Sequence, residues 1–220
     1  MQFRSLGKSD IEVSALGLGC WAIGGPYSHN GNANGWGKVD DNESISGIHK
    51  AIDNGVNFFD TADIYGCGHS EKILAKAIQG KRDQMIIATK FGITFDERDR
   101  SVTGECDEPE YIRKACEASL SRLDTDYIDL YQFHSGFHDD FFNDDLWDYL
   151  SKQVEKGKVR FLGNSISNDL VKSGDDRQLE ASQKYGISTI QIVYNRLSKE
   201  AENLLKKNNA ESAIIFKSFL

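Results

Sequence analysis

The chain alternates between short apolar runs and longer segments whose apolar residues recur at helical spacing. Seven short runs are strand-like in composition, at 13–19, 56–62, 85–90, 127–134, 159–165, 189–195 and 212–218. Between them, residues such as 45–52, 73–78 and 112–123 carry apolar side chains three or four positions apart, typical of amphipathic helices. Strands that alternate with helices predict a parallel α/β sheet covered by helices and joined by right-handed crossovers. Several runs are apolar on both strand faces, which fits either a doubly wound sheet or a (β/α)8 barrel.

Residue types at the element boundaries support this segmentation. Asp40 and Glu43 have the spacing of a capping box, which predicts the start of a helix. The glycines that stand where helices should end are Gly55, Gly80, Gly157 and Gly186. Residues 1–14 hold a Gly-Lys-Ser-Asp turn between two β-prone pieces, which predicts an N-terminal β-hairpin that closes the bottom of a barrel.

Residues 17–22 distinguish the two sheet architectures. Their sequence, GLGCWA, matches the G-x-G-x-x-A form of the dinucleotide fingerprint, whose glycines must open a helix. Here the glycines are followed by a stretch rich in Gly and Asn that also contains Pro26, and this composition does not sustain a helix. The sequence therefore favours a (β/α)8 barrel in which the first strand runs into a flexible loop.

Composition and charge narrow the class of protein. The 220 residues include 26 Lys and Arg against 34 Asp and Glu, a net charge of −8, and no basic stretch is interleaved with aromatics. Nucleic acid and membrane are therefore not expected partners. No apolar run is long enough to span a bilayer or to act as a signal segment, and the four cysteines lack C-x-x-C spacing. We expect a soluble cytoplasmic protein in which residues 1–220 form a single barrel domain.

Four ionisable residues lie at the ends of three consecutive predicted strands. Asp60, Lys90 and His134 lie near the ends of the second, third and fourth strands, and Tyr65 follows in the loop after the second. Parallel strands end on one face, and barrels build their active sites there. Each residue alone has an ordinary explanation as a solvated charge, a turn residue or a structural histidine. Together they predict a site.

This set of side chains can supply a proton to a carbonyl oxygen. A tyrosine titrates near ~10, and a neighbouring lysine ammonium lowers that pKa by favouring the phenolate. An aspartate paired with the lysine keeps it charged and in place, and a neutral histidine can donate a hydrogen bond to the substrate oxygen. Because protein side chains cannot provide a hydride, the scheme implies a nicotinamide cofactor.

Taken in order along the chain, these motifs resemble the aldo-keto reductase family. The stretches that carry the resemblance are GLGCWAIGG, GVNFFDTADIYGCGHSEKILAKAI, IIATKFG, SLSRLDTDYIDLYQFH, GKVRFLGNS and IQIVYN. The resemblance implies a (β/α)8 TIM-type barrel and reversible hydride transfer between a nicotinamide cofactor and an aldehyde or ketone. It also implies a catalytic tetrad of Asp60, Tyr65, Lys90 and His134, with Tyr65 as proton donor. Asp63 matches no member of this tetrad and is expected to be a loop residue.

The same resemblance implies a cofactor site. Its residues are Trp21, Asp60, Ser165, Gln191, Tyr194, Ser218 and Leu220. Ser165 and Gln191 resemble the ligands of the nicotinamide carboxamide, and Tyr194 resembles the ring on which the nicotinamide stacks, unless it packs under a helix. Trp21 would wall the pocket, and Ser218 and Leu220 would contact the pyrophosphate. The cofactor implied is NADP (NADPH), and NAD is left open.

One departure from the family pattern concerns the carboxamide ligands. Ile166 stands where the family often has an asparagine, and its side chain cannot form the same hydrogen bonds. Asn164 is the residue that could take this role. Carboxamide anchoring is therefore less firmly predicted than the tetrad.

The end of the sequence and the second function class complete the predictions. Seven strands are one fewer than the barrel needs, so we expect a chain truncated within or just after its seventh strand, with self-association possible through the open edge. The alternative to a carbonyl reductase is a non-catalytic barrel fragment or regulatory binding module of the same fold. No metal is expected, because His134 and His138 belong to no set of four ligands.

Overall fold

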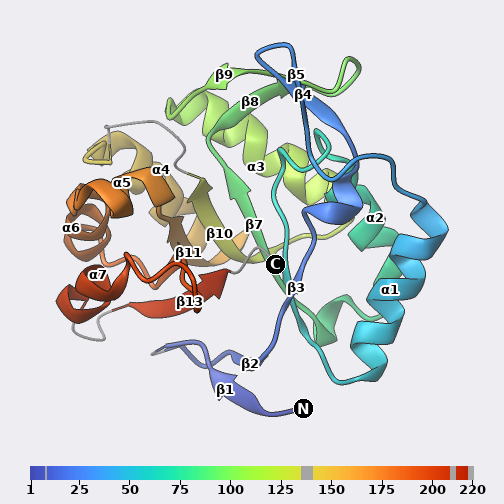
Figure 1. Cartoon of the computed structure of the whole chain (residues 1–220), viewed down its shortest axis with the longest axis horizontal. Helices are drawn as coiled ribbons and strands as arrows, with labels where there is room; N and C mark the ends of the chain where they lie inside the picture. The colour runs from blue at the N-terminus through green and yellow to red at the C-terminus, as the bar shows by residue number, and fades with distance from the viewer. Residues whose placement is uncertain (8, 135–140, 209–211, 218–220) are drawn as a thin grey trace.

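A parallel sheet forms the centre of the computed structural model, which describes residues 1–7, 9–134, 141–208 and 212–217. Its seven strands lie in the order β13-β12-β11-β10-β7-β6-β3, and every neighbouring pair is parallel (Figure 1). The strands are β3 (Leu18–Gly19), β6 (Phe58–Asp60), β7 (Ile86–Phe91), β10 (Ile128–His134), β11 (Val159–Ser165), β12 (Thr189–Val193) and β13 (Ala213–Lys217). The predicted α/β barrel-type fold is confirmed, and six of the seven predicted runs each overlap one strand of this sheet. The first run, 13–19, is divided: residues 13–14 belong to the separate strand β2 (Glu12–Ser14), and only Leu18–Gly19 join the sheet. Within the described ranges, β3 and β13 are the two edges of this sheet.

Helices follow the strands and cover the outer face of the sheet (Figure 1). They are α1 (Asp41–Asp53), α2 (His69–Ala77), α3 (Pro109–Leu123), α4 (Asp144–Glu155), α5 (Asn168–Ser173), α6 (Arg177–Lys184) and α7 (Glu202–Lys207), with short 3-10 turns η1 (Ala22–Gly24) and η2 (Arg82–Gln84). The Asp40 carboxylate accepts the backbone N–H groups of Asn42 and Glu43, which confirms the predicted helix start. The four glycines predicted at helix ends all have positive φ, from 62° to 85°. Among the described helices, none has the length and apolarity needed to cross a bilayer.

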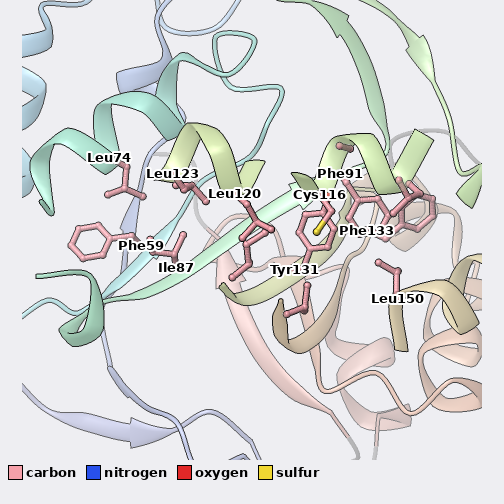
Figure 2. Close-up of a cluster of buried hydrophobic side chains, with 14 of the residues drawn as sticks. Phe59, Leu74, Ile87, Phe91, Cys116, Leu120, Leu123, Tyr131, Phe133 and Leu150 are labelled. Carbon is pink, nitrogen blue, oxygen red and sulfur yellow. The ribbon is translucent and has the colours of Figure 1, made fainter. Parts of the chain in front are cut away.

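The main hydrophobic core lies between the sheet and its helices. Because successive strand residues point to opposite faces, Phe59, Ile87 and Tyr131 face outward, where they meet apolar residues of α2 and α3 such as Leu74 and Leu120 (Figure 2). All three outward residues are fully buried. Burial of each such side chain contributes about 1.5–3 kcal/mol. This layer fixes which strand positions are left to face the barrel interior.

The lower part of the barrel interior is filled by the N-terminal hairpin. Strands β1 (Phe3–Ser5) and β2 (Glu12–Ser14) pair antiparallel. Leu6, Ile11 and Val13 from this hairpin pack with inward side chains of the sheet, including Ala88 and Leu130. The predicted hairpin and its place at the bottom of the barrel are confirmed.

The stretch after β3 is a folded hairpin, so the predicted flexible loop is wrong. Strands β4 (Tyr27–His29) and β5 (Asn32–Asn34) pair antiparallel and join β8 (Ile93–Asp96) and β9 (Ser101–Glu105) in a second sheet of order β5-β4-β9-β8. Asn30 and Gly31 have φ of 51° and 74° and form the two-residue turn. An Asn-Gly pair is the strongest short-range signal for such a hairpin. Figure 1 shows this sheet standing above the strand ends.

A buried ion pair joins α2 to α3. Arg122 Nε lies 2.6 Å from Glu71 Oε2, and both side chains are buried. Thr89 of β7 donates to Glu71 at 2.6 Å, so the pair is also tied to the sheet. Asp63 is a loop residue, as predicted, but it is buried beside this group. Burial, and then the charge of Glu71, raise the pKa of Asp63 well above its usual range.

Replacing Arg122 by Met should lower the free energy of unfolding by about 3–5 kcal/mol, because Glu71 is left as an uncompensated buried charge. Arg113→Met is the matched control, since Arg113 pairs with the exposed Glu110 on the same helix, and its loss should stay below about 1 kcal/mol. Urea unfolding of both variants measures the difference. Equal losses would contradict a structural role for the buried pair.

Candidate active site

The strand alternation that builds the core also directs one row of polar side chains inward. Asp60, Lys90 and His134 occupy inward positions at the carboxyl ends of β6, β7 and β10. Ser165 ends β11 directly opposite His134 in the register, and Gln191 of β12 is opposite Ser165. The structure therefore brings these five predicted residues to one rim of the barrel.

Lys90 is the centre of this group and is completely buried. Its Nζ donates to Asp60 Oδ1 at 2.8 Å, to the Thr61 carbonyl at 2.7 Å and to the Tyr65 hydroxyl at 3.3 Å. These three contacts use all three N–H donors of the ammonium. Burial alone would lower the pKa of Lys90, but the charges and hydrogen bonds of Asp60 and Tyr65 outweigh it and raise the pKa.

Tyr65 is protonated more firmly than the sequence argument predicts. Burial raises the pKa of its phenol to about 12, although the neighbouring Lys90 acts in the opposite direction. Lys90 does favour a lower pKa of Tyr65, as predicted. The prediction that the pKa of Tyr65 falls overall is wrong, because the cost of desolvating the phenolate exceeds the effect of Lys90. The phenol therefore keeps its proton throughout the neutral pH range.

His134 is held neutral next to Tyr65. Burial lowers the pKa of the imidazole well below its usual range, and the positive charges of Lys90 and Lys217 add to this. Its ring meets the ring of Tyr65 edge to face, with centroids 6.0 Å apart and planes at 84°. A neutral imidazole has one ring N–H that it can donate.

Two glycines fix the loop that carries Tyr65. Gly66 has φ of 62°, and a Cβ at this position would lie 1.9 Å from the Gly24 carbonyl oxygen. A Cβ at Gly24 would in turn lie 2.7 Å from the Tyr65 carbonyl carbon. The backbone after Tyr65 can approach η1 this closely only without side chains. Trp21, at the start of η1, stacks on Tyr65 with ring centroids 6.0 Å apart.

Gln191 and Ser165 have the chemistry needed to hold a carboxamide. Gln191 donates its side-chain amide to Asp60 Oδ1 at 2.8 Å. Its buried Oε1 has no partner within the described part of the chain and can accept an N–H. Ser165 Oγ accepts Lys217 Nζ at 3.0 Å. The residues present thus fit a nicotinamide carboxamide, which offers one N–H₂ donor and one carbonyl acceptor.

Tyr194 is not brought to this rim. It follows β12 on the outward side, its ring packs on Phe216 at 5.2 Å between centroids, and its hydroxyl donates to Glu202 at 3.3 Å. It belongs to the cluster under α7 that includes Leu204. Tyr194 thus has the alternative position that the sequence analysis allowed, that of an aromatic residue packed under a helix. The prediction that its ring lies where the nicotinamide would stack is wrong.

The proposed substitute for the missing asparagine is also turned away from the cleft. The Asn164 amide donates to the Gln178 carbonyl at 3.3 Å and to Ser182 Oγ at 3.1 Å, both on α6. Ile166 packs in the cluster under α7. Ser218 and Leu220 lie outside the described residues.

Sequence reasoning missed Lys217 and Trp36. Lys217 lies on the inward face of β13 together with Ala213 and Ile215, which pack against the barrel interior. Burial, and then the charge of Lys90, lower the pKa of Lys217 to about 8. Because side chains alternate between the two faces of a strand, the inward positions of residues 213 and 215 could have predicted that the Lys217 side chain also points inward. Trp36 meets Trp21 edge to face at 5.7 Å.

Part of this group lines one cleft. Its volume is about 1150 Å³, and its wall includes Trp21, Trp36, Asp60, Tyr65, Gln191 and Lys217. Within residues 1–7, 9–134, 141–208 and 212–217, no three His, Cys, Asp or Glu side chains are placed to hold a metal ion. His138, considered as a ligand from the sequence, lies outside the described residues.

Comparisons with known proteins agree with this architecture. The model of the aldo/keto reductase family matches residues 15–215. Aldo-keto reductase YhdN of Bacillus subtilis (strain 168) is 34% identical over 224 residues, covering 99% of this chain and 62% of YhdN. The chain therefore spans less than two thirds of that relative.

Solved structures show the same fold. The holo form of aldo-keto reductase AKR11C1 from Bacillus halodurans matches with a TM-score of 0.77 and 30% identity, over 98% of this chain and 65% of that one. An aldo/keto reductase from Klebsiella pneumoniae in complex with NADP and acetate matches with a TM-score of 0.69 and 25% identity, over 95% of this chain and 65% of that one. The family match, the TIM-type fold and the polar strand ends together show that this chain belongs to the aldo/keto reductase family, a family of oxidoreductases.

Proposed function

We propose that this chain carries the reaction centre of an NAD(P)H-dependent oxidoreductase that reduces aldehydes or ketones to alcohols. One observation carries the proposal: the buried Lys90 ammonium contacts both the Asp60 carboxylate and the Tyr65 hydroxyl. A structural ion pair would need only the carboxylate. The phenol at the end of this relay lies on the wall of the cleft, where a small carbonyl compound can reach it.

In this proposal Tyr65 donates its proton to the carbonyl oxygen as that oxygen gains negative charge. The Lys90 ammonium stabilises the phenolate that remains, and Asp60 holds the ammonium in place. Neutral His134 donates a hydrogen bond that orients the carbonyl oxygen. A nicotinamide cofactor, when bound, supplies the hydride, so no protein nucleophile is required.

The high pKa of Tyr65 suits a donor that acts only when a substrate is present. At neutral pH a phenol with a pKa of about 12 does not lose its proton to water. It can lose it to an oxygen that becomes an alkoxide, because an alkoxide is a far stronger base than water. The Lys90 ammonium then meets a full negative charge on Tyr65 at close range.

The cofactor residues of this proposal are Gln191 and Ser165 for the carboxamide, with Asp60 holding the Gln191 amide. Trp21 walls the cleft. The relative from Klebsiella pneumoniae binds NADP, which favours NADP over NAD for this chain without excluding NAD. Ser218 and Leu220 stay proposed contacts of the pyrophosphate. We further propose that residues 1–220 belong to one barrel domain, and no observation favours the non-catalytic alternative.

Replacing Tyr65 by Phe should lower kcat/KM for aldehyde reduction about 100-fold or more, because the proton donor is removed while the aromatic ring stays. Tyr149→Phe is the control, since Tyr149 lies on α4 among the residues packed against the helix-side core. NADPH oxidation with a panel of simple aldehydes measures both. Equal rates for the Tyr65 variant and the unmutated chain would remove Tyr65 from this role, and a complete lack of turnover in the unmutated chain would favour a binding module.

His134 should stay neutral to a lower pH than an ordinary histidine. Its pKa is lowered, so the imidazole is neutral above the lowered value and gains its proton only well below 6.5. Nitrogen-15 NMR of the histidine rings, with His134→Gln to assign the signal, follows this titration. A midpoint at or above 6.5 would show that the ring is not buried as described.

A further inference from the structure

Lys217 is a second lysine at the proposed reaction centre, and the proton relay does not use it. In the register, Lys217 is opposite Val193 of the neighbouring strand β12. Val193 is the next inward-facing residue after Gln191 on that strand. The Lys217 Nζ lies 3.0 Å from Ser165 Oγ. Lys217 and Gln191 both line the cleft. The ammonium therefore lies beside the two residues proposed to hold the carboxamide.

The charges at this place do not cancel. Among the residues that the structure describes, two ammonium groups, Lys90 and Lys217, face one carboxylate, that of Asp60, and Asp60 is already in contact with Lys90. His134 adds no charge because its imidazole is neutral. With a pKa of about 8, Lys217 is still mostly protonated at pH 7. The described side chains thus leave a net positive charge next to Ser165.

We propose that Lys217 contacts the nicotinamide end of the cofactor and favours its reduced form over its oxidised form. The inference rests on the proposed function, which puts the carboxamide between Ser165 and Gln191. The oxidised nicotinamide ring carries one positive charge, whereas the reduced ring is neutral. An ammonium beside the ring repels the first and leaves the second unaffected. In a partly buried site, such a repulsion changes a binding constant about tenfold or more.

The consequence for the reaction is a bias in its direction. A carbonyl reductase takes up the reduced cofactor and releases the oxidised one. An ammonium that weakens only the oxidised form assists the release step and limits inhibition by that form. A lysine that merely supports Ser165 would affect both forms equally, because Ser165 contacts the uncharged carboxamide in each.

Binding of oxidised and reduced nicotinamide mononucleotide at pH 7, measured by isothermal titration calorimetry, tests the proposal. Both probes carry the same phosphate and ribose, so the ratio of their dissociation constants isolates the charge of the ring. Lys217→Met removes the ammonium and keeps the apolar stem, and Lys217→Arg keeps a charge at this position. Lys81→Met, at an exposed position after α2, controls for the loss of one surface charge.

The unmutated chain and the Lys217→Arg and Lys81→Met variants should bind the reduced probe more tightly than the oxidised one. In Lys217→Met the dissociation constant of the oxidised probe divided by that of the reduced probe should fall about tenfold, because the oxidised probe binds more tightly. If both probes bind and Lys217→Met leaves their ratio unchanged, the inference is wrong and the proposed function stands. If neither probe binds the unmutated chain, the proposed nicotinamide site is wrong and the inference fails with it.

Discussion

The buried ammonium of Lys90 is the constraint on which the site depends. An ammonium removed from water costs several kcal/mol unless its charge is paired and its N–H groups are all accepted. The chain meets this requirement with a carboxylate from β6, a carbonyl from the next residue and the phenol of the following loop. The same three contacts therefore hold β6, β7 and the Tyr65 loop in one arrangement. The geometry that the proposed proton transfer requires is therefore also the geometry that stabilises the buried charge of Lys90.

Much of the fold was predictable because its signals are local. Apolar runs gave the seven strands, Asp40 gave a helix start, and glycines gave the helix ends. Asp60, Lys90 and His134 were predicted at strand ends, and their meeting on one face followed because parallel strands end on the same face. None of these inferences needs knowledge of what surrounds a residue. Each depends only on the residue type and on its distance from its neighbours along the chain.

The incorrect predictions concern burial and side-chain direction, which local patterns do not fix. Tyr194 lies one position past the end of β12, so a shift of one residue decides between the cleft and the helix layer. Lys217 was overlooked for the same reason, since its direction follows from the parity of a five-residue strand. The net pKa shift of Tyr65 depends on how much protein surrounds the phenol, and a sequence does not give that quantity. The Asn30–Gly31 turn, in contrast, has a local signal, since an Asn-Gly pair favours the positive φ angles of a two-residue hairpin turn.

The contact between Gly24 and Gly66 limits how the mouth of the cleft can move. With no room for even one carbon atom between the two backbones, neither can slide past the other. Any displacement of the loop that carries the phenol must therefore shift η1, and with it the indole of Trp21 that stacks on the same ring. Tyr65, the proposed proton donor, and Trp21 on the pocket wall are therefore coupled through these contacts. A ligand that displaces the Trp21 indole would thereby also change the direction in which the Tyr65 hydroxyl points.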